Sequence, residues 1–86
     1  MKIIYHNDAG HGWYAIKRDK LKAMGILDKV SAFSYQRGNT VYLEEDCDAS
    51  LFFDALEDRG SVVVVGSYQD RSAIRNYDRF TLEEGE

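Results

Sequence analysis

The chain has 86 residues, a formal net charge of −4, a single cysteine and no proline. This length allows one domain with a modest hydrophobic core. No apolar run is long enough for a transmembrane helix and no second cysteine can form an internal disulfide, which excludes a membrane-spanning helix and a fold built on disulfides. We therefore expect a cytoplasmic protein with no membrane partner.

The N-terminal third predicts a hairpin followed by a short helix. Residues 2–6 are rich in branched and aromatic side chains, and residues 12–16 have the same character. Between them, residues 7–10 read Asn-Asp-Ala-Gly, which is typical of a turn. Residues 17–24 favour a short helix, in which Leu21 and Met24 share one face. Gly25 follows where a left-handed C-terminal cap is expected.

A second hairpin is predicted next. Its first strand covers residues 29–36 and places Ser31, Phe33 and Tyr35 on one face. Its second strand covers residues 40–45, where apolar and polar side chains again alternate. The intervening Arg-Gly-Asn sequence is typical of a tight turn.

The remaining chain predicts a helix, a strand and a loop. Asp48 is expected to cap a helix that ends at Gly60. Residues 61–67 contain four consecutive valines, a run typical of a strand with both faces covered. Residues 68–80 predict a loop and a short final strand, with one helical turn as the alternative. Residues 81–86 predict an acidic flexible tail.

These elements give the order β-β-α-β-β-α-β. Alternating hairpins and short helices favour an α+β fold. We therefore expect a single α+β domain over residues 1–80, with a small, mostly antiparallel sheet of about five strands and two short helices.

The stretch LEEDCDASLFF, residues 43–53, concentrates acidic side chains around Cys47. We interpret it first as a helix start, because carboxylates favour the N-terminal end of a helix. As a divalent-cation site, the stretch lacks the ligand spacing of an EF-hand loop. As a nucleophile, Cys47 is disfavoured because the acids beside it oppose formation of the thiolate. The functional interpretation is an acidic surface that binds a partner with a basic surface. Its residues would be Glu44, Glu45, Asp46, Asp48, Asp54, Glu57 and Asp58.

His6, Asp8 and His11 supply a second set of residues suited to metal binding or acid–base chemistry. They lack the helical or cysteine-paired spacing that makes a zinc motif specific. We predict no catalytic residue, no metal and no cofactor. Aromatic residues on the predicted strands are expected to pack in the core, although an exposed aromatic platform with basic neighbours would suit single-stranded nucleic acid.

Residues 10–60 resemble a group of small proteins encoded by bacteriophages and plasmids. The pieces that carry the resemblance are HGW (11–13), LKAMGI (21–26), SAFSY (31–35) and YLEEDCD (42–48). The resemblance implies a mobile-element accessory protein in the host cytoplasm. Such a protein would act by protein–protein binding, as an inhibitor that blocks a host nucleic-acid-handling or defence complex.

Residues 16–43, IKRDKLKAMGILDKVSAFSYQRGNTVYL, also resemble the swapped-hairpin transition-state regulators of the AbrB family. That resemblance implies the alternative function, a dimeric DNA-binding transcription regulator. The chain itself is expected to be a monomer or a homodimer. The candidates for phosphate contacts are Lys17, Arg18, Lys20, Lys22 and Lys29.

Overall fold

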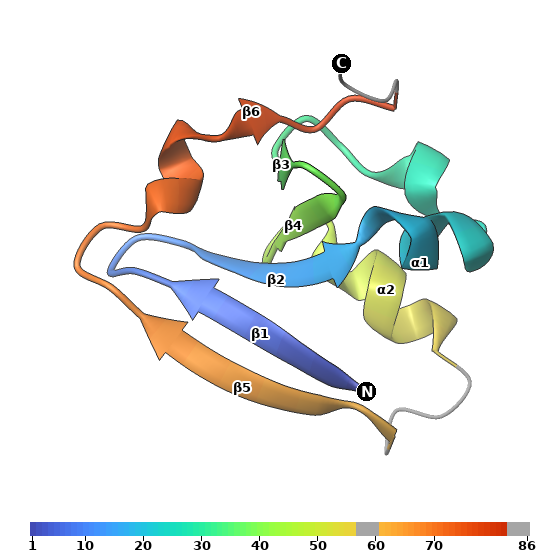
Figure 1. Cartoon of the computed structure of the whole chain (residues 1–86), viewed down its shortest axis with the longest axis horizontal. Helices are drawn as coiled ribbons and strands as arrows, with labels where there is room; N and C mark the ends of the chain where they lie inside the picture. Colours follow the sequence, from blue (N-terminus) through green and yellow to red (C-terminus); the bar gives the residue numbers. More distant parts are fainter. Residues whose placement is uncertain (57–60, 83–86) are drawn as a thin grey trace.

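The computed structural model describes residues 1–56 and 61–82, which form one six-stranded sheet and two short α-helices (Figure 1). The strand order is β5-β1-β2-β4-β3-β6, and every pairing is antiparallel except the parallel pair β1–β5. The strands are β1 (Lys2–Asn7), β2 (Gly12–Lys17), β3 (Tyr35–Arg37), β4 (Thr40–Glu44), β5 (Val63–Tyr68) and β6 (Asp78–Arg79). The helices are α1 (Arg18–Ala23) and α2 (Ala49–Ala55), with 3-10 turns η1 (Leu27–Lys29) and η3 (Ala73–Asn76). The predicted α+β class is confirmed, with six strands in place of about five.

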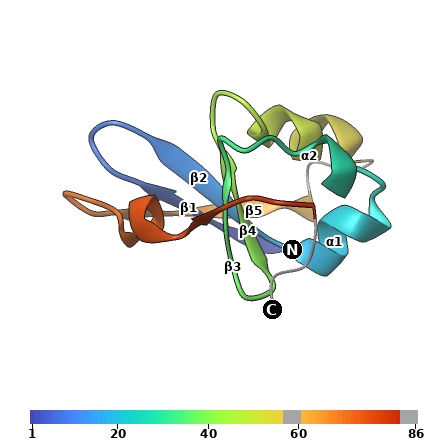
Figure 2. The ribbon, with the colours of Figure 1, turned by 90° about the horizontal axis from the view of Figure 1, so that it is seen from above.

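Helices α1 and α2 lie on the same side of the sheet, where they cover the hydrophobic core (Figure 2). The sheet contributes alternate residues of β1, β2 and β4 to this core, as the two-residue period of a strand requires. The fully buried members include Leu21 of α1, Phe52 of α2 and Leu43 of β4. The predicted first hairpin is confirmed, and Gly25 adopts the expected positive φ of 76° after α1.

The opposite face of the sheet is only partly covered. Register places Ile4 beside Ala15 and Ala15 beside Tyr42, so these three side chains share this face. The turn η3 covers one end of it, where Tyr77 contacts the ring of Tyr42. The other end, over β1 and β5, has no such cover within the described residues.

The predicted strand over residues 29–36 is wrong for most of its length. Residues 27–29 form η1, residues 32–33 form a turn, and β3 begins only at Tyr35. The cause is the carboxylate of Asp48, which accepts hydrogen bonds from the N–H and Oγ of Ser31 and from the Oγ of Ser34. These bonds hold the chain in a turn, and Phe33 is left 62% exposed.

Helix α2 begins where it was predicted, after Asp48, but the role of Asp48 is different. Its side chain makes no capping hydrogen bond to the helix, because both carboxylate oxygens bind the serines of the preceding turn. The helix ends at Ala55, earlier than expected, and Leu56 is extended. The predicted end at Gly60 lies outside the described residues.

The predicted burial of the valine strand is also wrong. Among the residues that the structure describes, strand β5 lies at the edge of the sheet and pairs with β1 alone, so one of its sides has no neighbouring strand there. Val63, Val64 and Val65 are 60%, 45% and 40% exposed. Residues 73–76 form a helical turn and residues 78–79 a short strand, which agrees with the alternatives expected for that segment.

The start of the predicted tail is tied to the domain. The guanidinium of Arg18 donates hydrogen bonds to the carbonyl oxygens of Thr81 and Leu82, at 3.0 and 2.6 Å. Within residues 1–56 and 61–82, no helix is both long and apolar enough to cross a membrane.

Candidate functional site

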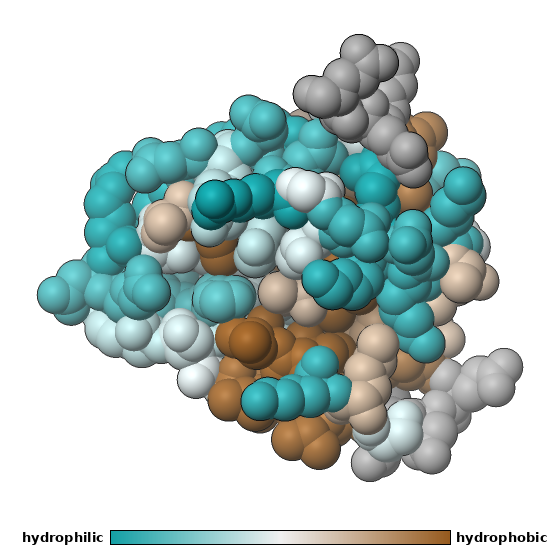
Figure 3. Space-filling view, viewed as in Figure 1, coloured by the Kyte–Doolittle hydropathy of each residue, from teal (hydrophilic) through white to brown (hydrophobic). Residues whose placement is uncertain are grey.

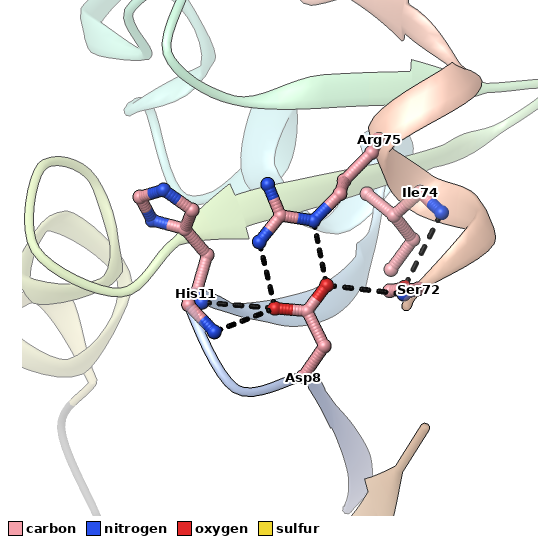
Figure 4. A network of polar contacts seen from close by, with 6 residues as sticks. Asp8, His11, Ser72, Ile74 and Arg75 are labelled. Carbon is pink, nitrogen blue, oxygen red and sulfur yellow. Dashed lines mark hydrogen bonds and ion pairs between the residues drawn. The ribbon is translucent and has the colours of Figure 1, made fainter. Parts of the chain in front are cut away.

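The turn between β1 and β2 is organised by Asp8 (Figure 4). Its Oδ1 accepts hydrogen bonds from the backbone N–H groups of Gly10 and His11, both at 3.0 Å. The backbone N–H of Asp8 donates to the carbonyl oxygen of His11 at 2.9 Å. This is the local side-chain bonding through which aspartate favours turns, and it explains why Asn-Asp-Ala-Gly reverses the chain here.

Arg75 of η3 clamps the same carboxylate from the other end of the sequence. Its Nε lies 2.6 Å from Oδ2 and its Nη2 lies 2.7 Å from Oδ1, and the N–H of Ser72 donates to Oδ2 at 3.0 Å. The hydrogen bond from Arg75 and those from the backbone hold the pKa of Asp8 far below its usual range and raise the pKa of Arg75. The pair fixes η3 on the first hairpin and fixes the plane of the guanidinium.

Behind the guanidinium lies Trp13. The Arg75 guanidinium carbon is 5.6 Å from the centre of the Trp13 ring, and His11 and Tyr35 pack on the same ring at 6.0 and 6.1 Å. Trp13 is only 2% exposed, and its Nε1 has no hydrogen-bond partner among the residues that the structure describes. The Arg79 guanidinium carbon lies 4.7 Å from the centre of the Tyr35 ring. Two arginines are thus stacked on two adjacent aromatic rings.

These groups surround an open cleft of about 320 Å³. The cleft lies between the first hairpin, β4, the turn before β3, and the segment that contains η3 and β6. Its lining residues are His11, Trp13, Phe33, Tyr35, Glu44, Arg75 and Arg79. They combine aromatic faces, guanidinium N–H donors and one carboxylate acceptor, a set that can hold a flat ring with a polar edge.

No protein-family model, curated protein or solved structure matches this chain. The chemistry of the cleft therefore rests on its own geometry.

The residues of the predicted acidic surface are not all on a surface. Asp48 is 2% exposed and holds the serine turn, while Glu44 is 7% exposed and accepts a hydrogen bond from the N–H of Asp46. Glu45, Asp46 and Asp54 are exposed, and Glu45 accepts a hydrogen bond from the hydroxyl of Tyr5 at 3.0 Å. Glu57 and Asp58 lie outside the described residues. Glu44 and Asp48 must be removed from the predicted surface because internal bonds occupy them.

The residues of the predicted basic segment divide in the same way. Lys17, Lys20, Lys22 and Lys29 are exposed. Arg18 is 6% exposed, donates to Gln36 Oε1 at 3.0 Å and lies over the ring of Phe80 at 5.3 Å. Arg18 therefore anchors the C-terminal segment and is not available to a phosphate.

The predicted titratable candidates do not assemble into one site. Asp8 is occupied by Arg75, and His6 lies on β1, where desolvation lowers its pKa. Partial desolvation and the carboxylates of Glu44, Asp48 and Asp46 raise the pKa of Cys47, which opposes thiolate formation as the sequence suggested. Over residues 1–56 and 61–82, no three His, Cys, Asp or Glu side chains are grouped so that they could hold a metal ion.

Sequence reasoning missed Arg75 and Arg79. Both lie in residues 68–80, where the sequence left a loop with a strand and a helical turn as alternatives. In this segment Arg71, Arg75 and Arg79 recur every four residues. That recurrence was the available signal. It could not identify the aromatic rings beneath the two guanidinium groups, because those rings come from residues 13 and 35.

Proposed function

We propose that this protein binds single-stranded nucleic acid and takes one base into the cleft between Phe33 and Arg75. The observation that carries the proposal is the stacking of Arg75 and Arg79 on Trp13 and Tyr35 around that cleft. Aromatic rings on which bases stack, together with arginines that donate hydrogen bonds to the phosphate backbone, are the recurring elements of single-strand recognition.

The arginines of this face favour contacts with phosphate. A guanidinium that lies over an aromatic ring keeps N–H groups at its edge, and these match a phosphate or a base edge. Arg37 repeats the arrangement on Tyr77 at 5.0 Å. The segment 69–82 also carries three arginines against two aspartates, whereas the whole chain has a net charge of −4. The segment is therefore less acidic than the chain as a whole, which lowers the repulsion of a polyanion there.

The cleft also offers what a base requires. The exposed ring of Phe33 provides a stacking surface, and the guanidinium groups that line the cleft provide donors for a base edge. Glu44 also lines the cleft, with its Oε1 already bonded to the N–H of Asp46. The buried Nε1 of Trp13 is one further donor without a partner in the described residues. We expect a base with both acceptor and donor atoms on its edge to bind most tightly.

The first test is titration of the protein with fluorescein-labelled DNA and RNA single strands of about 12 nucleotides, a length within the usual range of single-strand sites. Anisotropy reports binding, and the fluorescence of the only tryptophan reports occupancy beside the cleft. Phe33→Ala is expected to weaken binding by about 5-fold to 150-fold, since one stacked base contributes about 1–3 kcal/mol. Arg79→Ala is expected to weaken binding and to reduce its salt dependence.

The matched control is Lys20→Ala combined with Lys22→Ala, which removes two exposed cations of α1 and leaves the cleft intact. This variant is expected to bind as the wild type does. Loss of binding in the control, with Phe33→Ala unchanged, would support the alternative in which the basic segment contacts DNA. No binding by the wild type at low salt would overturn both proposals.

A second candidate function is protein binding through the acidic stretch, as expected for a mobile-element accessory protein. It is favoured by Glu45 and Asp46, which are adjacent and exposed. The partner would be a host protein or nucleoprotein complex with a basic surface. Affinity capture from a nuclease-treated bacterial lysate should retain it, and Glu45→Lys with Asp46→Lys should abolish its capture. Retention by the reversed variant would count against this surface.

A further inference from the structure

Strand β5 leaves a long apolar sheet edge open. It is six residues long, it is the outermost strand of the sheet, and its valines are exposed. In Figure 3 the hydrophobic side chains of the visible face gather over β1 and β5. The exposed residues of this region include Met1, Ile4, Val63 and Val65. Edges of this kind pair with further strands unless charge, proline or a covering element blocks them.

We infer that two copies of this chain pair through β5 in an antiparallel manner, with Val65 of one copy opposite Val65 of the other. The result is a homodimer with one continuous sheet across a two-fold axis. This inference is independent of the proposed nucleic-acid binding.

The backbone bonds already made by β5 determine which groups face outward. The N–H of Val63 donates to Met1 O at 2.8 Å and the N–H of Gln69 donates to Asn7 O at 3.0 Å. Because backbone groups alternate sides along a strand, the odd-numbered residues of β5 face β1. The N–H and C=O groups of Val64, Gly66 and Tyr68 therefore face the open edge and can form the new ladder.

The two strands can form hydrogen bonds only in registers where residues whose backbone groups face the open edge lie opposite one another. A two-fold axis at Val65 satisfies this condition, since it pairs Val64 with Gly66 of the other copy and Val62 with Tyr68. It uses nearly the whole strand and sets Val65 against Val65. An axis at Gly66 also satisfies the condition and overlaps as much of β5, but it sets Val65 against Ser67 and not against a second valine. The axis at Val65 is therefore favoured.

Charge and shape favour a second copy as the occupant. At a two-fold axis a residue meets its own copy, so a charge there would be repelled, and residues 61–69 contain no charged residue. A Cβ placed on Gly66 would have no heavy atom within 4 Å, so this position has room for Val64 of the other copy. On the open face, Val65 lies beside Ile4, and pairing extends this apolar row across the axis.

The direct test is a cross-link at the axis, in a Cys47→Ser background that removes the exposed native thiol. Val65→Cys should form an intermolecular disulfide under mild oxidation. The two Cα atoms of such a non-hydrogen-bonded pair lie about 4.5 Å apart, within the range that a disulfide spans. Val63→Cys is the matched control and should not cross-link, because its two copies lie several residues apart along the strand. Cross-linking of Val63→Cys without Val65→Cys would overturn the register.

Sedimentation of the unmodified protein tests the dimer itself. The wild type should sediment as a dimer, and Val65→Lys should sediment as a folded monomer, because two lysines would meet at the axis. Leu82→Lys, which alters another exposed apolar residue, should remain dimeric. A wild type that stays monomeric at its highest soluble concentration would overturn the inference, and would leave β5 open to a strand from another protein.

Discussion

Replacing Asp8 by asparagine should lower the melting temperature by about 10 °C or more, because it removes the carboxylate that is paired with the guanidinium of Arg75. The carboxylate accepts bonds from Arg75 and from three backbone N–H groups. An asparagine of the same shape has one acceptor oxygen and presents an NH₂ group to donors. Thermal unfolding by circular dichroism measures the effect. The control is Asp70→Asn, which changes an exposed acid near the same loop and should leave the melting temperature nearly unchanged.

The same residue should make the fold sensitive to acid. The pKa of Asp8 is lower in the folded chain than in the unfolded chain, so the unfolded chain takes up the proton first as the pH falls. The stability that this carboxylate supplies is therefore fully present above about pH 5, and it is lost progressively as the pH falls through the ordinary aspartate pKa of about 3.9 toward the lower pKa of the folded chain. Wild-type stability should decline over this window more steeply than that of Asp8→Asn. Parallel pH profiles for the two proteins would contradict this account.

Replacing Asp48 by alanine should cost about 2–4 kcal/mol of unfolding free energy, because it leaves buried donors without an acceptor. The donors are the N–H and Oγ of Ser31 and the Oγ of Ser34, and Ser34 is fully buried. Urea denaturation measures the loss. Asp48→Asn keeps one acceptor oxygen and should fall between alanine and the wild type.

The matched control for this experiment is Asp46→Ala. Asp46 is exposed two residues away, so its removal should change the free energy of unfolding by less than about 0.5 kcal/mol. Equal stability of Asp48→Ala and Asp46→Ala would show that the serine turn is not held by Asp48. It would also restore the simpler account in which both acids serve only the start of α2.

Sequence patterns predicted the elements whose causes are local. The first hairpin follows from strand-forming residues around an Asp-Ala-Gly turn, and α1 ends where Gly25 takes its positive φ. The failures have causes that lie far along the chain. Ser31 and Ser34 leave the extended conformation because of a carboxylate that follows them by 14–17 residues. No periodicity within residues 29–36 could carry that information.

The candidate site was hidden for the same reason. Asp8 and Arg75 are separated by 67 positions, and each has an ordinary local role when viewed alone. The three valines of β5 show the limit of composition, because an apolar run indicates a strand without indicating its neighbours. Here the neighbour on one side is β1, and the other side is the edge of the sheet.

The parallel pairing of β1 with β5 also has a consequence for how the protein is made. Lys2 aligns with Val63, so β1 leaves the ribosome well before the strand with which it pairs in parallel. During synthesis β1 can pair with β2 early, since a short turn joins them, but its other edge stays unpaired until residues 63–68 emerge. Closing such distant contacts is slow compared with forming a hairpin. The nascent chain therefore exposes an unpaired β1 edge until residues 63–68 have emerged, and this interval favours aggregation or capture by a chaperone.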